Sequence, residues 1–210
     1  LQYHEVKINL TMGDSTVLTV PGDLPNLTLW VDYIYLDTDE RRRFAQVSHE
    51  YLIEQLQFQS FGKENTTLNL NFNHPVKELI WTGAWINASG FPTNMCGYNS
   101  TNRWGLKLNG HDRFTPRGHQ YFAGTQIYQH HSGDGAIDYF GDETVENIHV
   151  YSFALKPEEH QPSGTCNFSR IDSAQLQLTV GTLSNGVFVY AVNYNVLRIM
   201  SGMGGLAYSN

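Results

Sequence analysis

Cysteine is scarce in this sequence: the 210 residues include two, Cys96 and Cys166, which lie 70 positions apart. Their number excludes a disulfide-rich scaffold, and the absence of a CxxC pair excludes a zinc ribbon. The two thiols could still form a bridge, but the preferred interpretation is two reduced, buried cysteines in an intracellular protein.

Charged residues are also few, at 16% of the chain, and acidic side chains outnumber basic ones by 20 to 13, which gives a net charge of −7. Binding to a phosphate backbone needs clustered lysine and arginine. The one basic run, Arg41 to Arg43, is short and follows acidic residues. The composition therefore argues against a nucleic-acid binder, and so low a charged fraction suggests that partners cover much of the surface.

Long apolar runs are missing as well. None approaches the roughly 20 residues needed to cross a bilayer, and there is no charged-then-apolar signal segment, so we expect no membrane insertion. The chain opens on Leu1, Gln2 and Tyr3, and we expect it to be a piece of a longer polypeptide. With 40% hydrophobic and 13% aromatic residues, it can nevertheless bury a substantial core.

Alternation of apolar and polar residues is the dominant pattern that is present, for example in the segment LQFQ at Leu56–Gln59. This period of two predicts antiparallel sheets with one apolar row facing inward. The predicted strands are Tyr3–Thr11, Leu27–Leu36, Tyr51–Gln59, Leu68–Asn73, Val76–Trp85, Glu146–Leu155, Gln175–Val180 and Val187–Met200. Repeated helical periodicity is absent, so we predict an all-β fold, an eight-stranded antiparallel jelly-roll sandwich.

One short helix and one long loop complete the predicted fold. Asp37 can cap a helix that ends near Gln46, with Glu40 at its third position and the arginines after the acids, so that the basic run becomes a solvated helix face. The stretch from about 86 to 145 is rich in Gly, Asn, His and Tyr, and we interpret it as a long inter-strand loop that is functional or part of an interface. No linker is evident, so residues 1–210 are expected to form one domain.

The nine histidines invite a metal hypothesis, with His130 and His131 as the obvious pair. Adjacent residues on a strand point to opposite faces, so these two could share a metal only from a loop. The histidine pattern of metal-binding cupins is absent, and His49-Glu50 is followed at the required position by Ile53 instead of a second histidine. We expect no metal and no cofactor.

The sequence also contains no complete catalytic motif. Residues 202–207 fit the spacing G-x-G-x-x-A, but the helix and the acidic residue that a dinucleotide site needs do not follow. A nucleophile elbow is absent. Glu158 and Glu159 are adjacent acids on a proline-flanked loop and are expected to be solvated. We therefore expect no catalytic residues and no enzymatic activity.

Sequons for N-glycosylation occur six times. They lie at Asn9, Asn26, Asn65, Asn87, Asn99 and Asn167. Asn87 and Asn99 are the best-placed candidates because both fall in the predicted long loop, and sugars are attached at accessible surface positions.

Four long blocks carry a family resemblance. They are LQYHEVKINL at the start, LWVDYIYLDTDERRRFAQVSHEYLIEQLQ from Leu29 to Gln57, YSFALKPEEHQPSGTCNFSRID from Tyr151 to Asp172, and NYNVLRIMSGMGGLAYSN at the end. Together they resemble the major capsid protein of nucleocytoplasmic large DNA viruses, the group of the chloroviruses, iridoviruses and mimivirus-like viruses. The blocks follow the family's order and span the chain.

The resemblance implies a structural virion protein: the C-terminal half of a double jelly-roll chain, three copies of which form a pseudo-hexagonal capsomer in an icosahedral shell. Implied partners are the protein itself as a homotrimer, neighbouring capsomers, and minor capsid and penton proteins, with no direct contact to nucleic acid. The implied location is the outer capsid shell, assembled in the host cytoplasm. The loop Tyr151–Asp172 becomes an inter-barrel packing element with Arg170 and Asp172 as polar anchors.

Two other classes remain open. A glycan-binding, lectin-like jelly roll could stack sugars on the aromatic residues of and around the long loop, which are Trp81, Trp85, Tyr98 and Trp104. A cupin-like enzyme would require a bound metal.

Overall fold

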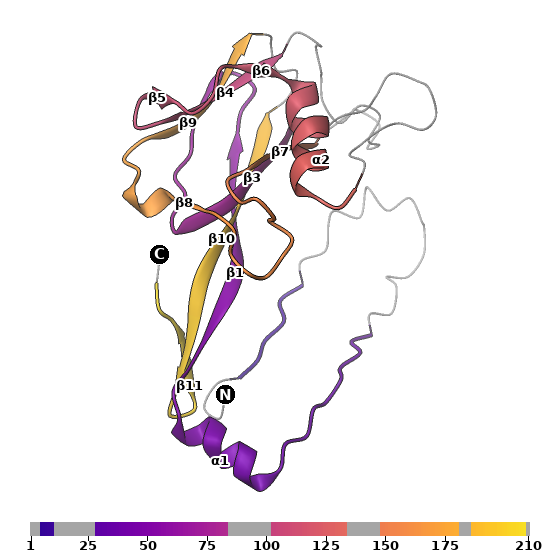
Figure 1. Ribbon diagram of the computed structural model, residues 1–210, viewed down its shortest axis with the longest axis vertical. Helices are drawn as coiled ribbons and strands as arrows, with labels where there is room; N and C mark the ends of the chain where they lie inside the picture. Colours follow the sequence, from indigo (N-terminus) through magenta and orange to yellow (C-terminus); the bar gives the residue numbers. More distant parts are fainter. Residues whose placement is uncertain (1–4, 11–27, 84–101, 134–147, 181–185, 209–210) are drawn as a thin grey trace.

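The protein is a two-sheet β-sandwich in a computed structural model that describes residues 5–10, 28–83, 102–133, 148–180 and 186–208 (Figure 1). The six-stranded sheet contains β1 (His49–Phe61), β3 (Pro75–Gly83), β7 (Ile148–Ser152), β8 (Cys166–Asn167), β10 (Val187–Met200) and β11 (Met203–Leu206). The five-stranded sheet contains β2 (Thr67–Asn69), β4 (Arg103–Leu108), β5 (His111–Asp112), β6 (Arg117–Gly118) and β9 (Ala174–Val180).

The order of the strands is that of a jelly roll. The six-stranded sheet has the central order β1-β10-β3-β7, and the other sheet has the order β2-β9-β4-β5. Along the chain, the strands β1, β3, β7 and β10 of the six-stranded sheet therefore alternate with the strands β2, β4 and β9 of the other sheet. The last of them, β10, lies between β1 and β3. All of the pairings are antiparallel. The predicted all-β jelly-roll class is confirmed, although the list of eight strands differs from the observed one.

The core lies between the two sheets and is built around aromatic side chains. Trp81 of β3 is 1% exposed and packs edge to face against Trp104 of β4 and against Phe122, with ring centroids 6.0 and 5.0 Å apart. His149 of β7 stacks on Trp81 at 5.4 Å. Edge-to-face packing of this kind adds specificity to the burial of large apolar area. This packing fixes how the two sheets lie against each other around Trp81.

The predicted helix is confirmed as α1 (Thr38–Gln46). The side chain of Asp37 accepts a hydrogen bond from the backbone N–H of Glu40 at 2.9 Å, as the capping pattern requires. None of the side chains of α1 is buried, and the helix lies at the end of the molecule farthest from the five-stranded sheet (Figure 1). The three arginines are therefore exposed, as predicted.

The two N-terminal strand predictions are wrong for the residues that the structure describes. Residues 5–10 and 28–36 have extended backbone without a place in either sheet. Their apolar side chains are solvent-exposed; Trp30, Ile34 and Tyr35 are 90%, 88% and 90% exposed. The pattern of a strand is present here, but a strand is stable only against a partner. No described segment pairs with either one.

The stretch from 86 to 145 is more ordered than a loop over its described part, residues 102–133. It contributes β4, β5 and β6 to the second sheet, followed by a π-helix η1 (Tyr121–Thr125) and a helix α2 (Gln126–His130). Trp104, Leu106 and Phe122 from this stretch are at most 2% exposed and belong to the core. The sequence pattern did not predict β4, because the strand has only six residues, RWGLKL, and Arg103, Gly105 and Lys107 interrupt its apolar positions.

The side-chain rows of β1 are reversed from the prediction. Leu56 and Phe58 are 62% and 52% exposed, whereas Gln57 turns inward beside Ala191 of β10. Gln57 donates to Asn193 Oδ1 at 3.0 Å and to the carbonyl oxygen of Asn73 at 2.7 Å, and its own Oε1 accepts from the Asn73 N–H. These bonds satisfy both backbone groups of Asn73, and the Oε1 of Gln59 likewise accepts from the Asn71 N–H at 3.0 Å. The inward polar row is therefore an internal ladder of hydrogen bonds.

Candidate assembly surfaces and a buried charge cluster

The segment that follows β7 is fastened to one dipeptide of β3, Lys77-Glu78. We call residues 153–164 the clamp loop. The pairing of β10 with β3 shifts between Val192 and Asn193, which leaves Lys77 as an extra residue in β3. Such a bulge re-aims a side chain. The Lys77 carbonyl oxygen accepts from the N–H groups of Phe153 and Ala154 at 2.8 and 3.2 Å.

The Lys77 side chain is buried and fully engaged. The side chain is 4% exposed, and its ammonium nitrogen lies 2.6 Å from Glu54 Oε1 and donates to the Pro157 carbonyl oxygen, also at 2.6 Å. It also lies 5.6 Å from the ring centroid of Tyr194. A buried ammonium group needs several such partners to offset its lost hydration. Lys77 therefore joins β1, β3 and the clamp loop at one point.

A second set of contacts holds the clamp loop against the end of α2. His131 Nε2 lies 3.0 Å from Glu78 Oε2, and its Nδ1 lies 3.1 Å from Glu158 Oε1. Glu158 also accepts hydrogen bonds from the backbone N–H and the hydroxyl of Ser132. His130 Nδ1 lies 3.0 Å from the Leu155 carbonyl oxygen. The two histidines thus face different partners on the clamp loop and on β3.

The carboxyl groups of Glu78 and Glu158 differ in acidity because their surroundings differ. Burial raises the pKa of Glu78, and the nearby His131 and Lys77 oppose that rise. Hydrogen bonds from Ser132 lower the pKa of Glu158. Neither carboxyl group lines either of the two pockets found among the described residues, and within the described ranges no group of three or more His, Cys, Asp or Glu side chains is arranged to hold a metal ion. This geometry fits a structural fastening of the loop.

The two predicted anchors of the longer loop Tyr151–Asp172 lie at its C-terminal end, beyond the clamp loop. Arg170 ends a short 3-10 helix η2 (Phe168–Arg170), and the backbone N–H of Asp172 donates to Asn109 Oδ1 at 2.9 Å. Both side chains are exposed, and in the described structure neither forms a hydrogen bond or an ion pair. Their anchoring role stays a prediction. Sequence reasoning missed Lys77 and Glu78, and it considered His131 only as a metal ligand; the meeting of these residues depends on the bulge.

Other predicted sites fall outside the described residues: Asn87, Asn99, Trp85, Tyr98 and Cys96. Cys166 is a half-buried free thiol whose pKa is raised by burial. Trp81 and Trp104 are 1% and 2% exposed, so the hypothesis that they stack sugars is wrong. Their rings pack against each other in the core, where no ligand reaches them. Residues 203–206 of the glycine-rich end form β11, which pairs with β10.

The outer face of the six-stranded sheet carries an apolar row that is open to solvent. Phe58 of β1 pairs with Tyr190 of β10, which pairs with Ile80 of β3, so these three side chains share one face. The Phe58 ring lies 5.0 Å from that of Tyr190 and 5.6 Å from that of Phe188. Together with the neighbouring Leu56 they form the outer apolar face. Large exposed apolar patches mark interaction sites.

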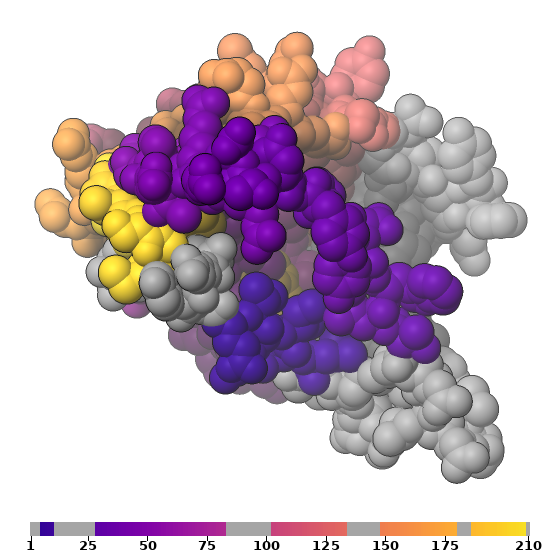
Figure 2. Space-filling model, turned by 90° about the horizontal axis from the view of Figure 1, so that it is seen from below, coloured from indigo at the N-terminus to yellow at the C-terminus, as the bar shows by residue number. Residues whose placement is uncertain are grey.

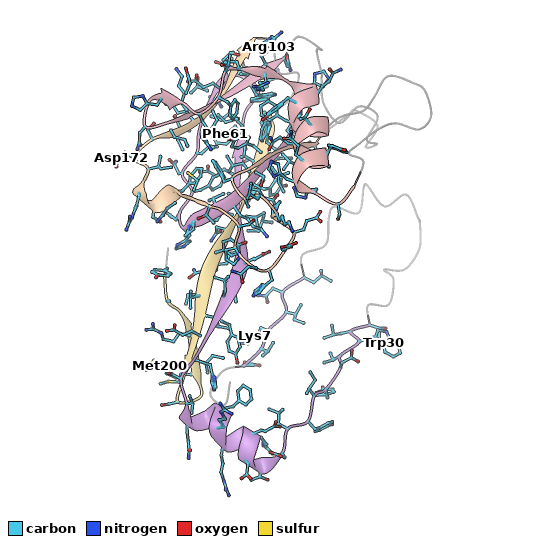
Figure 3. The ribbon with its side chains drawn as sticks, in the orientation of Figure 1. Lys7, Trp30, Phe61, Arg103, Asp172 and Met200 are labelled. Carbon is cyan, nitrogen blue, oxygen red and sulfur yellow. The ribbon has the colours of Figure 1, made fainter. Side chains whose placement is uncertain are left out.

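A second apolar surface lies beside α1. Residues 28–36 lie apart from the sandwich and lead into α1, and their side chains, including that of the labelled Trp30, project into open space (Figure 3). Figure 2, the view from below, shows residues 5–10 and 28–47 together at this end of the molecule. We call residues 5–10 and 28–36 the N-terminal arm. No helix in the described ranges has the length and apolar character that crossing a membrane requires.

Comparison with known proteins identifies the family to which this sandwich belongs. The family described as large eukaryotic DNA virus major capsid protein matches residues 40–205. The chain is 57% identical to the major capsid protein of Pyramimonas orientalis virus and 39% identical to that of Paramecium bursaria Chlorella virus 1. All of this chain is covered in both cases, but it spans only 56% and 62% of those two proteins.

The fold agrees with these relationships. A chain of the PBCV-1 virus capsid superimposes with a TM-score of 0.67 and 38% sequence identity, over 85% of this chain and 56% of that one. The family match over residues 40–205 includes β1 through β10 and all but the last residue of β11, and therefore both sheets and the clamp loop. On this evidence the chain belongs to the major capsid protein family of large eukaryotic DNA viruses.

Proposed function

We propose that this chain is a structural part of a virus capsid, the C-terminal barrel of a two-barrel protein that assembles as a homotrimer. In this proposal three two-barrel chains supply the six wedges of a pseudo-hexagonal tile, and the tiles build an icosahedral shell. The role is mechanical and involves no reaction. Family membership supports this proposal. The charged residues around the clamp loop support it too, because they contact one another within the protein.

The observation that carries the proposal is the exposure of apolar side chains on two separate surfaces. In the N-terminal arm, Trp30, Ile34 and Tyr35 are nearly fully exposed, and on the outer apolar face Leu56 is 62% exposed. Burying such a side chain is worth about 1.5–3 kcal/mol. Both surfaces are therefore suited to contact with protein, and permanent interfaces are characteristically apolar.

The two surfaces fit different neighbours. Residues 28–36 have the nearly continuous apolar composition of a strand buried on both faces, whereas residues 5–10 alternate between polar and apolar side chains, as a half-buried strand does. We assign both parts of the arm to pairing within the other barrel of the same chain. The outer apolar face is a flat sheet surface and suits packing against a barrel, either of the same chain or of the next one. A ring of three copies uses heterologous contacts that close under cyclic symmetry.

The wider partners follow from the family resemblance. Neighbouring capsomers, minor capsid proteins and penton proteins are the proposed contacts, with no direct contact to nucleic acid. The proposed location is the outer shell of the virion, after assembly in the host cytoplasm. The predicted role of Arg170 and Asp172 as anchors between barrels belongs to the same proposal.

Native mass spectrometry of the full-length protein tests the oligomer. We expect a trimer as the main species, and a monomer or dimer at every concentration would contradict the proposal. Phe58→Asp should prevent assembly because it places a charge in the outer apolar face. Tyr128→Asp is the matched control, since Tyr128 is 80% exposed on α2 outside both surfaces. Equal effects of the two substitutions would show that the outer apolar face is not an assembly contact.

A further inference from the structure

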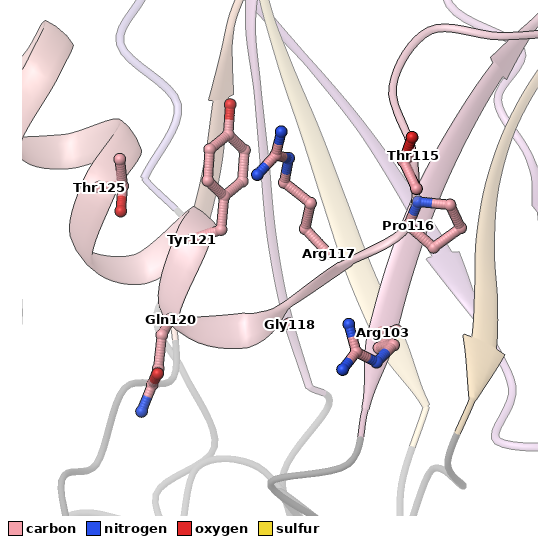
Figure 4. A pocket seen from close by; sticks show the side chains of 8 residues that line it. All are labelled: Arg103, Thr115, Pro116, Arg117, Gly118, Gln120, Tyr121 and Thr125. Carbon is pink, nitrogen blue, oxygen red and sulfur yellow. The ribbon is translucent and has the colours of Figure 1, made fainter.

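A polar pocket of about 490 Å³ lies between β4 and the start of η1, away from both apolar surfaces. It is lined by Arg103, Thr115, Pro116, Arg117, Gly118, Gln120, Tyr121 and Thr125 (Figure 4). Arg117 reaches from β6 to the ring of Tyr121, while Arg103 extends from β4 toward the segment that holds Gly118 (Figure 4). A Cβ atom built on Gly118 meets nothing within 4 Å, so the pocket is open beside this residue.

The charge of this pocket is unusual for the protein. The chain carries a net charge of −7, yet the lining contains two guanidinium groups and no carboxylate. None of the ion pairs among the described residues involves Arg103 or Arg117. Arginine presents five N–H donors in a planar fork that matches carboxylate and sulfate-like groups. The pocket therefore offers two permanent positive charges to an external anion.

The position of Arg117 is fixed by a chain of contacts that ends in the sheet. Its guanidinium carbon lies 4.6 Å from the ring centroid of Tyr121. The hydroxyl of Tyr121 accepts a hydrogen bond from Gln126 Nε2 at 2.9 Å, and Gln126, 3% exposed, accepts from the Ser152 N–H of β7 at 3.1 Å. These contacts hold the Arg117 guanidinium group in place at the pocket, and a group that is already held loses less conformational freedom when it binds a ligand.

The backbone that presents Tyr121 and Thr125 is a π-helix. This conformation is rare and occurs frequently at functional sites. It is a second observation, independent of the charge, that marks this part of the molecule.

We infer that the pocket binds an acidic saccharide, a sugar chain bearing carboxylate or sulfate groups. The arginines would bind the acidic groups, and the hydroxyls of Thr115 and Thr125 and the amide of Gln120 suit the hydroxyl groups of a sugar. The ring of Tyr121 and Pro116 are the main apolar elements of the lining, which disfavours a lipid. A single open pocket of this kind gives weak binding, and a repeated array of copies strengthens it by avidity.

Isothermal titration of the unassembled full-length protein tests the site independently of assembly. The probes are a galacturonic acid hexamer, a heparin-type sulfated hexasaccharide and neutral maltohexaose. We expect at least one acidic probe to bind and the neutral one not to bind. The acidic probe that binds more tightly identifies the anion for which the pocket is built. Failure of both acidic probes at millimolar concentration, or equal binding of maltohexaose, would overturn the inference.

Arg103→Gln and Arg117→Gln should each weaken binding about tenfold or more, because each removes a charge-assisted hydrogen bond. Arg42→Gln is the matched control: it removes the same charge from the exposed helix α1, where Arg42 lies 3.5 Å from Asp39, and should change binding less than twofold. All three arginines are exposed, so the variants should fold, which circular dichroism checks. An equal loss in Arg42→Gln, or no loss in either pocket variant, would show that the attraction is not localised in the pocket.

Discussion

The ammonium nitrogen of Lys77 lies 2.6 Å from Glu54 Oε1, and this ion pair joins β3 to β1 across the strand β10 that separates them. Tyr194 of β10 pairs with Glu54 in the sheet and places its ring under the ammonium group, 5.6 Å away. The same nitrogen donates to the clamp loop at Pro157. One buried charge therefore ties three strands and a loop together, and its removal affects all of them.

Lys77→Met should lower the free energy of unfolding by about 1–3 kcal/mol. The methionine fills the space of the lysine stem, but the Pro157 carbonyl oxygen loses its donor and the buried Glu78 loses a nearby positive charge. Chemical denaturation measures the change. Lys156→Met is the control, because Lys156 pairs with Glu159 in an exposed i,i+3 contact and should matter by less than about 0.5 kcal/mol. Equal changes would mean that the burial of Lys77 is unimportant.

Acidification from pH 6.5 to about 4 should destabilise the fold through His149. Burial lowers the pKa of His149 from 6.5 to about 4, so the unfolded chain binds a proton that the folded chain excludes across this interval. The stability that the neutral imidazole contributes is complete above pH 6.5 and is lost as the pH falls, by roughly 3 kcal/mol. Unfolding curves at several pH values measure the loss.

His149→Gln isolates this effect, because glutamine cannot titrate. Glu78 acts in the opposite direction: burial raises its pKa, so its contribution to stability falls as the pH rises above 4.5. The informative quantity is therefore the difference in slope between the wild type and the variant. If both show the same dependence between pH 6.5 and 4, His149 is not the group responsible.

Glu158→Ala should release the clamp loop from α2. The substitution removes the acceptor for Ser132 and one of the two carboxylates beside His131. We expect faster amide hydrogen exchange at residues 155–163, with little change in the sheets. Glu159→Ala is a close control, because Glu159 contacts only Lys156 within the loop itself. Equal exchange in wild type and Glu158→Ala would show that the contacts of Glu158 do not hold the loop.

Gly164→Ala should destabilise the clamp loop at its other end. Gly164 has φ of +152°, and a Cβ atom there would lie 2.7 Å from the Phe153 carbonyl oxygen. We expect a loss of roughly 1–3 kcal/mol, since the backbone must shift. Gly133→Ala is the control, because an added Cβ there meets nothing within 4 Å, and it should leave the stability nearly unchanged. Thermal unfolding of both variants measures the difference. A neutral Gly164→Ala would mean that the loop relaxes freely.

Local sequence signals predicted those elements whose stability depends on near neighbours in the chain. The cap of α1 at Asp37 depends on Glu40, three residues away, and was predicted correctly. The alternation in β9 and the two-sided apolar character of β10 near Val189 also sufficed, because these strands lie centrally in their sheets. The family resemblance carried the fold class further than the patterns alone.

Tertiary structure decided the features that depend on partners distant in the sequence. Residues 28–36 have the pattern of a strand, but no described segment pairs with them, so the pattern alone produced a wrong prediction. The inward turn of Gln57 depends on Asn73 and Asn193, and the meeting of Glu78, His131 and Glu158 depends on a bulge in β3. Periodicity records which side chains are apolar, whereas the sheet register decides which of them find a partner, because a shift of one residue turns every side chain to the other face.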